Sequence, residues 1–189
     1  MPRLGRVILS PPALDPLVPV KKTLAALSIA LVCVPFAAAS PTASKPNLPV
    51  HGVLHLGDNL AGVRIGDTNA RVRKLWGSNY ELCPDCESPT WYYLYESGEP
   101  LGAAVTFKGG KVVAAFTLGS PTGWHTAEGL LMGEEISRAA ELYPSLGWHV
   151  CIGYGAMTKR IGNTVTSIYT TGEAVYGFAI TAPAESVCQ

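Results

Sequence analysis

Apolar positions recur at helical spacing in two stretches of the chain. In residues 62–77, "GVRIGDTNARVRKLWG", the apolar side chains of Val72, Leu75 and Trp76 are three and four positions apart. Residues 129–144, "GLLMGEEISRAAELYP", show the same spacing. Because residues three and four apart lie on one face of a helix, each stretch predicts one short helix with an apolar face.

Segments with the composition of β-strands follow each predicted helix. They are rich in β-branched and aromatic residues and are separated by glycine-containing turns, which is typical of antiparallel strands joined by hairpins. After the first helix they are 90–95, 101–107 and 111–118, and after the second they are 147–154, 164–170 and 173–181.

One face of each predicted sheet must lie under its helix, because a helix and a sheet each bury one apolar side. In these strands we expect the bulkier alternate residues to face the helix and the smaller ones to form an open, shallow platform. The residues expected to face the helix are Val112, Ala114, Phe116, Leu118, Tyr176, Phe178 and Ile180.

The two halves of this pattern match each other. Placing the first helical stretch over the second aligns Gly66 with Gly133 and the acidic Asp67 with Glu134. Asp67 or Thr68 can cap the first helix, and the second opens with Glu134 and Glu135. A carboxylate is favourable at a helix start, so we interpret Asp67 and Glu134 as capping residues rather than a catalytic pair. The sequence therefore predicts an α+β fold of two tandem repeats, each a short helix packed on an antiparallel sheet of about three to four strands.

The first forty residues have the composition of an exported precursor. Two lysines, an apolar run of about 13 residues and three alanines follow one another, as in a secretory signal peptide. The apolar run is shorter than a membrane-spanning helix requires. We predict an upstream extension and signal peptide over 1–39, a linker over 40–59, a first repeat over 60–122 and a second repeat over 123–189.

The glycine-led helix start resembles a known signature. The pattern "G-V-R-I-G-D-T-x-A-x-V-x-x-L-W-G" is similar to the opening of the BamE (SmpA/OmlA) lipoprotein family, and a tandem pair of such units is similar to the β-lactamase-inhibitory protein superfamily. The resemblance covers about residues 60–181 and implies a helix-on-sheet fold and a binding role, without a target. The chain departs from the BamE family, whose members have one unit and a lipidated cysteine.

Four cysteines follow the predicted signal, namely Cys83, Cys86, Cys151 and Cys188. An even number of cysteines in an exported chain predicts disulfides. Three pairings are possible, and we favour the local one, Cys83 with Cys86 and Cys151 with Cys188. The alternative for the "CPDC" pair is thiol–disulfide chemistry, but strand-like residues follow it instead of the helix that lowers the pKa of such a thiol.

The sequence offers no complete set of metal ligands or catalytic groups. Zinc would require Cys151 and His149 beside the "CPDC" pair, but these two lack the usual ligand spacing, and oxidation competes with metal binding. His51 and His55 are four apart in an extended segment, which separates them by about 13 Å and favours solvated side chains. With no nucleophile–base–acid set either, the sequence predicts no metal and no cofactor.

The remaining candidate is a binding surface. Residues 40–189 hold ten Lys and Arg against thirteen Asp and Glu, and this mildly acidic balance argues against a nucleic-acid partner. In "TWYYLY", Trp91, Tyr93 and Tyr95 share one strand face, and exposed aromatic side chains are good interface anchors. We therefore predict a secreted or envelope-associated, non-catalytic protein that binds a protein or peptide on its sheet and has no stable membrane span after signal cleavage. The alternative is an extracytoplasmic thiol–disulfide protein that uses the "CPDC" pair.

Overall fold

The computed structural model describes residues 48–93 and 102–189 of the chain. These residues belong to one compact unit. The predicted extension and signal peptide, 1–39, lie outside the described residues.

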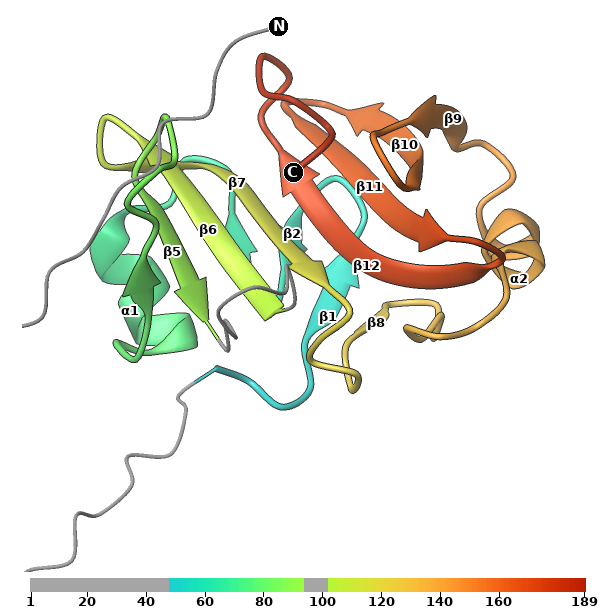
Figure 1. Ribbon diagram of the computed structural model, residues 1–189, viewed down its shortest axis with the longest axis horizontal. Helices are drawn as coiled ribbons and strands as arrows, with labels where there is room; N and C mark the ends of the chain where they lie inside the picture. The colour runs from blue at the N-terminus through green and yellow to red at the C-terminus, as the bar shows by residue number, and fades with distance from the viewer. Residues whose placement is uncertain (1–47, 94–101) are drawn as a thin grey trace, which may run out of the picture. The chain divides into compact units, whose positions relative to one another are not determined.

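Twelve strands and two short helices make up the described part of the chain (Figure 1). The helices are α1 (Asn69–Trp76) and α2 (Ile136–Leu142). The strands are β1 (Val53–His55), β2 (Asn59–Leu60), β3 (Val63–Arg64), β4 (Glu81–Leu82), β5 (Thr90–Tyr93), β6 (Gly102–Lys108), β7 (Lys111–Leu118), β8 (His125–Thr126), β9 (Gly147–Val150), β10 (Gly155–Ile161), β11 (Thr164–Thr171) and β12 (Ala174–Thr181).

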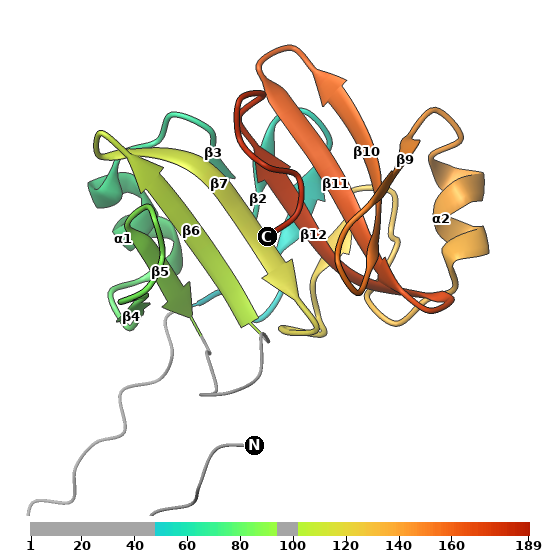
Figure 2. The same cartoon turned by 45° about the horizontal axis from the view of Figure 1, so that its top comes forward.

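The strands form two sheets. The large sheet has eight antiparallel strands in the order β4-β5-β6-β7-β12-β11-β10-β9, so β4 and β9 are its two outer strands. The small sheet has four short strands in the order β3-β2-β1-β8, in which β1 and β8 are parallel. Helices α1 and α2 and the small sheet cover one face of the large sheet (Figure 2).

The predicted fold class, α+β with two tandem helix–sheet repeats, is wrong. The chain is mostly β, and the strands of both predicted repeats form one continuous eight-stranded sheet. The join is the pairing of β7 with β12, the last strand of each predicted repeat. Gly177 allows this pairing, because a Cβ atom at this position would collide with the carbonyl oxygen of Thr117. The apolar pattern within each half of the sequence predicts the strands of that half, but it does not predict that strands of the two halves pair with each other.

Most of the small sheet comes from segments that the sequence pattern did not assign to strands. Strand β1, inside the 40–59 segment predicted as a linker, pairs with β2 through Leu54 and Leu60. The same strand pairs with β8 on its other side. Strands of two or three residues are too short to display a period-2 alternation of apolar and polar positions, which explains why the pattern missed them.

The two glycine-led turns attach each helix start to a strand of the large sheet. The N–H of Gly66 donates to the carbonyl of Val112, and the N–H of Gly133 donates to the carbonyl of Val175, both at 2.8 Å. Their φ angles of 88° and 85° lie in the left-handed region that glycine adopts most readily. These glycines are therefore explained by backbone geometry.

The helix α1 is capped at both ends, whereas α2 lacks a side-chain cap. The Thr68 hydroxyl accepts the N–H of Arg71 at 3.2 Å, and the N–H of Gly77 donates to the carbonyl of Arg73 at 2.9 Å. Thr68, and not Asp67, is thus the N-cap. At the start of α2, the side chain of Glu135 makes no capping hydrogen bond.

The main core lies between the large sheet and the layer of helices and small sheet. Because side chains from all three elements meet there, the small sheet is held by apolar packing as well as by backbone pairing. Its fully buried large side chains are Trp76, Trp124, Tyr93, Phe107, Phe178, Leu54, Leu60, Leu130, Ile168, Ile180 and Val63.

A β-bulge changes the expected alternation in β7. The pairing of β6 with β7 shifts by one residue near the start of β7, so both Val112 and Ala115 contribute to the main core. Phe116 and Leu118, which were expected under the helix, lie instead in a second apolar cluster on the opposite face of the large sheet. The side chain of Tyr176 packs against the same cluster, so its expected orientation is wrong too.

Candidate functional site

The predicted aromatic anchors lie in the core. Trp91 and Tyr93 belong to β5, and their side chains are only 4% and 1% exposed. They pack in the main core with residues of α1. The third predicted anchor, Tyr95, lies outside the described residues. Burial of this kind does not suit a residue that must reach a partner, so the structure gives Trp91 and Tyr93 a packing role.

Ring contacts fix this aromatic cluster. Tyr80 stacks on Trp91 with ring centroids 4.0 Å apart, and Trp76 meets Tyr93 edge to face at 5.5 Å. The hydroxyl of Tyr93 donates to the carbonyl of Gly77 at 3.3 Å, and burial raises the pKa of this hydroxyl. The cluster therefore joins α1 to the large sheet near β4.

The face of the large sheet opposite the helices, expected to be an open platform, carries the end of the chain itself. We define the C-terminal tail as residues 182–189, which turn back after β12 and run across this face (Figure 1). The hydroxyl of Tyr169 donates to the carbonyl of Val187 at 2.6 Å, and that of Tyr154 donates to the carbonyl of Gln189 at 3.0 Å. Burial raises the pKa of Tyr169 well above its ordinary value. The tail therefore covers the part of this face around Tyr154 and Tyr169.

The two disulfides follow the pairing that the sequence favoured. Cys83 is bonded to Cys86 and Cys151 to Cys188. The second disulfide ties the tail to the turn after β9. The first lies between β4 and β5, and no helix starts there. The helix dipole that activates a thiol in thiol–disulfide enzymes is therefore missing at the "CPDC" pair.

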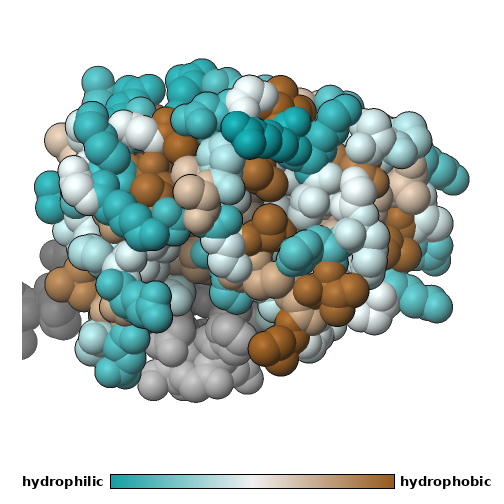
Figure 3. Space-filling model, turned by 90° about the horizontal axis from the view of Figure 1, so that it is seen from above, coloured by the Kyte–Doolittle hydropathy of each residue, from teal (hydrophilic) through white to brown (hydrophobic). Residues whose placement is uncertain are grey.

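The outer strand β9 exposes a row of apolar side chains. All four of its residues are exposed, and Trp148, Val150 and Ile152 are 57%, 75% and 100% exposed. The indole of Trp148 lies across Gly155 of β10, where a Cβ atom would collide with the ring. Trp148 is thus held in place while much of its surface remains accessible. On the face shown in Figure 3, apolar groups (brown) interrupt the polar surface (teal).

The backbone of β9 is open on one side. Cys151 donates its N–H to the carbonyl of Tyr154 at 3.0 Å, and alternate residues of an antiparallel strand direct their backbone groups to the same side. His149 therefore faces β10, whereas the N–H and C=O groups of Trp148 and Val150 point away from it. Within the described residues, no strand pairs with β9 on that side. Unpaired groups in a row form a template for another extended chain.

Two basic residues of β10 follow the stretch that pairs with this open strand. Residues 142–172 contain Lys159 and Arg160 and no Asp or Glu. The ammonium group of Lys159 donates to the hydroxyl of Ser145 at 2.9 Å, and Arg160 donates to the carbonyl of Gly162 at 3.2 Å. Among the described residues, neither cation forms an ion pair with a carboxylate. The β9 region therefore keeps two positive charges that an acidic partner can meet.

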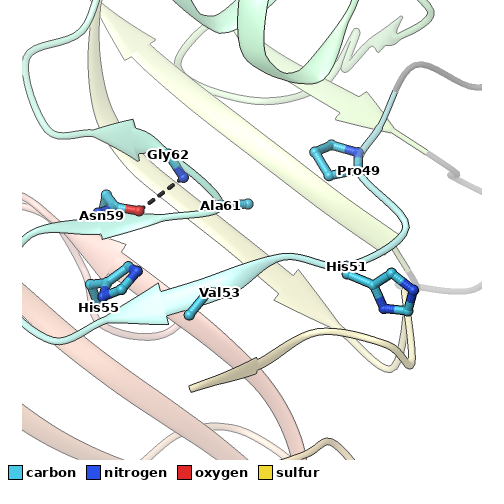
Figure 4. A pocket seen from close by; sticks show the side chains of 7 residues that line it. All are labelled: Pro49, His51, Val53, His55, Asn59, Ala61 and Gly62. Carbon is cyan, nitrogen blue, oxygen red and sulfur yellow. Dashed lines mark hydrogen bonds between the residues drawn. The ribbon is translucent and has the colours of Figure 1, made fainter. Parts of the chain in front are cut away.

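A separate pocket lies on the outer face of the small sheet (Figure 4). His51 and His55 stand at opposite ends of the pocket, with Val53 between them, so their imidazole rings do not converge on one point. Both histidines are exposed, as the sequence predicts. A binding pocket usually has several convergent polar groups, which this one lacks. Its volume is about 310 Å³, and it is lined by Pro49, His51, Val53, His55, Asn59, Ala61 and Gly62.

Asp67 and Glu134, the two aligned acidic residues, each accept a hydrogen bond within the turn that precedes their helix. The carboxylate of Asp67 accepts the N–H of Arg64, and that of Glu134 accepts the N–H of Leu131, both at 2.9 Å. These bonds involve the turn before each helix, so the two carboxylates stabilise turns and are not the N-caps of the helices. In the small sheet, hydrogen bonds from the Arg64 guanidinium lower the pKa of Asp58 from 3.8 to about 2.

The exposed apolar residues that the sequence pattern did not single out are Trp148, Val150 and Ile152. They are every second residue of a predicted strand, but the sequence does not show that this strand lies at the edge of the sheet.

Neither helix in residues 48–93 and 102–189 combines the length and the apolar character that crossing a membrane requires.

The chain has few detectable similarities. No protein-family model and no curated protein matches its sequence. One solved structure is similar, an extracellular protein containing a SCP domain from Bacillus anthracis str. Ames, at 10% sequence identity and a TM-score of 0.48. The match covers 69% of this chain and 49% of that one, so the chain spans about half the length of the matched protein.

Proposed function

We propose that this protein is an extracytoplasmic, non-catalytic binding protein, and that an extended segment of its partner pairs with β9. The observation that carries the proposal is the combination of unpaired backbone groups with the exposed side chains of Trp148, Val150 and Ile152. In strand addition the main chain provides affinity, and alternate side chains provide specificity. Trp148, held over β10, provides an aromatic anchor.

The compartment is inferred from the cysteines and the N-terminal sequence. Two disulfides are stable in oxidising compartments and rare in the cytosol. The basic, apolar and small-residue order before residue 40 is that of a secretory signal. The resemblance to the BamE and β-lactamase-inhibitory protein families also implies a binding role.

The partner segment is expected to be apolar and acidic. Alternate apolar side chains would pack on Trp148 and Val150, while acidic residues beside them would meet Lys159 and Arg160. A second copy of this chain suits the edge less well, because it would bring the same basic region to β9. This charge difference selects a heterologous acidic partner.

The decisive variant is Val150→Pro, tested with a synthetic peptide of alternating valines and flanking glutamates. Proline removes the N–H that points outward from β9 and leaves the hydrogen bonds to β10 intact, so the fold is retained. Isothermal titration should show the dissociation constant of the peptide rising roughly tenfold or more. The interaction should also weaken with salt, because exposed charges are screened.

Two matched variants make the test specific. Val150→Thr keeps the outward N–H and a β-branched side chain, so the affinity should stay close to that of the wild type. Leu82→Ser removes an exposed apolar side chain from β4 at the opposite edge and should have no effect. If the peptide does not bind the wild type, or binds Val150→Pro equally well, the proposal is wrong.

A further inference from the structure

The second disulfide lies beside a histidine. One ring nitrogen of His149 and the sulfur atoms of Cys151 and Cys188 all lie within 4.8 Å of one another. His149 belongs to β9, Cys151 begins the turn that follows it, and Cys188 comes from the C-terminal tail. Among the described residues, this is the one group of three such ligand-bearing side chains.

The strand register aims His149 at the two sulfurs. His149 is paired with Ala156, and Ala156 is paired with Tyr169, so all three side chains lie on the sheet face that carries the tail. Cys151 and Cys188 belong to the apolar cluster on that face. His149 itself is exposed, so the three groups have access to solvent from the outer edge of the sheet.

Two thiolates and one imidazole are a common ligand set for zinc. Zinc–sulfur bonds of about 2.3 Å and zinc–nitrogen bonds of about 2.0–2.1 Å in tetrahedral geometry place the ligand atoms a little under 4 Å apart. The observed grouping within 4.8 Å therefore needs only a small adjustment once the sulfur–sulfur bond is broken. A water molecule can take the fourth position, because His149 is accessible.

We propose that reduction of the Cys151–Cys188 disulfide creates a Zn²⁺ site formed by His149, Cys151 and Cys188. The reductant is an external dithiol, which supplies two electrons and two protons to the two sulfurs and itself becomes a disulfide. Zn²⁺ then displaces the two thiol protons and is bound by two thiolates and a neutral imidazole. The metal takes over the connection between the tail and β9 that the disulfide makes in the oxidised protein.

The test uses the full chain with Cys83→Ser and Cys86→Ser, so that the two remaining cysteines after the signal are those of the proposed site. The protein is reduced with a dithiol, freed of excess reagent without air, and titrated with Zn²⁺ and separately with Co²⁺. We expect one metal ion per chain and a thiolate-to-cobalt charge-transfer band. The oxidised protein should show neither.

The variant His149→Ala distinguishes zinc binding by all three ligands from zinc binding by the two thiolates alone. Its affinity for Zn²⁺ should fall roughly tenfold or more, since even outer-shell partners of a zinc site change affinity by that factor. His55→Ala removes another exposed histidine and should leave the affinity unchanged. Equal affinity in His149→Ala, or equal metal uptake by the oxidised protein, would overturn the proposal.

Thermal unfolding gives a second, independent measurement. Reduction should lower the midpoint by releasing the tail, and Zn²⁺ should raise the midpoint of the reduced protein but not that of the oxidised one. If Zn²⁺ leaves the reduced protein unchanged, the metal does not connect the tail to β9 and the proposal fails. The outcome is separate from the peptide experiment, which uses the oxidised protein.

Discussion

Aromatic side chains are buried at one end of the large sheet and exposed at the other. At the α1 end, Trp76 of the helix packs against Tyr93, and Trp91 is stacked on Tyr80 in the same buried cluster. At the β9 end, Trp148 lies on the outer strand with more than half of its surface exposed, next to Val150. A buried ring stabilises the fold through lost contact with water, whereas an exposed ring held in place is available to a partner.

The two outer strands differ in the same way. Strand β4 has two residues and is followed at once by the loop that the Cys83–Cys86 disulfide closes. Strand β9 has four residues, and in the described part of the chain no strand pairs with its outward side. Short edges are a common protection against unwanted strand pairing. The comparison indicates that the aromatic side chains at the α1 end stabilise the fold, whereas the side chains at the β9 end stay accessible.

The largest expected effect comes from Trp76→Ala at the α1 end. Its side chain is fully buried and touches the rings of Tyr93 and Trp124, so the substitution leaves a large cavity. We expect the free energy of unfolding to fall by about 3–5 kcal/mol in urea denaturation. Trp148→Ala should change it by less than about 0.5 kcal/mol. Similar losses in both variants would contradict the division between the two ends.

The next effect concerns the disulfides near the two edges. Cys151 and Cys188 are 37 residues apart, whereas Cys83 and Cys86 are three apart. Replacing Cys151 and Cys188 by serine should lower the free energy of unfolding by about 2–4 kcal/mol, because a long loop of the unfolded chain is no longer closed. The same replacement of Cys83 and Cys86 should cost less. Thermal unfolding of the two double variants ranks them, and the reverse order would refute this expectation.

A smaller effect distinguishes the two helices. Thr68→Ala removes the hydroxyl that accepts the N–H of Arg71, which should lower the free energy of unfolding by about 1 kcal/mol. Glu135→Ala changes the corresponding position of α2, where the side chain makes no capping hydrogen bond. Urea denaturation should show a loss of only a few tenths of a kcal/mol, the usual size of an exposed charge–dipole effect. Equal losses would mean that both helix starts depend on their side chains to the same extent.

The smallest effect belongs to the small sheet, which lies between the two ends. The Arg64 guanidinium lowers the pKa of Asp58 from 3.8 to about 2, so the folded state favours the charged carboxylate. A lowered pKa contributes stability above the ordinary pKa, and that contribution is lost as the pH falls from about 4 to about 2. Because the pair is exposed, the contribution is small.

Asp58→Asn isolates this contribution. Between pH 4 and pH 2, its free energy of unfolding should fall less steeply than that of the wild type, whereas Glu141→Gln on α2 should leave the Asp58 contribution in place. Parallel pH profiles for Asp58→Asn and the wild type would show that the ion pair does not contribute to folding.

Local features of the fold were accessible from the sequence because neighbouring residues specify them. The helical spacing around Val72 and Trp76 predicted α1, and the glycines at 66 and 133 predicted tight turns before both helices. The favoured pairing of the four cysteines is also confirmed. It rested on joining each cysteine to the partner in its own half of the sequence. Each of these features depends on short separations along the chain.

The site was less predictable because burial and edge position depend on distant residues. Trp91 and Trp148 each belong to a strand-like, aromatic sequence, yet the first lies under α1 and the second on an outer strand. A one-residue bulge in β7 was enough to move Phe116 to the other face of the sheet. Side-chain alternation has a period of two, so a single shift reverses the assignment of every following residue.

The sequence by itself determined the helices, the glycine turns, the cysteine pairing and the signs of export. Tertiary structure decided that β7 pairs with β12 to join both halves in one sheet, that the C-terminal tail covers the face opposite the helices, and that β9 is left at the edge. The physical reason is that helix and turn formation follow from interactions between near neighbours. Sheet order, in contrast, follows from which distant strands bury the most apolar surface and pair their backbone groups together.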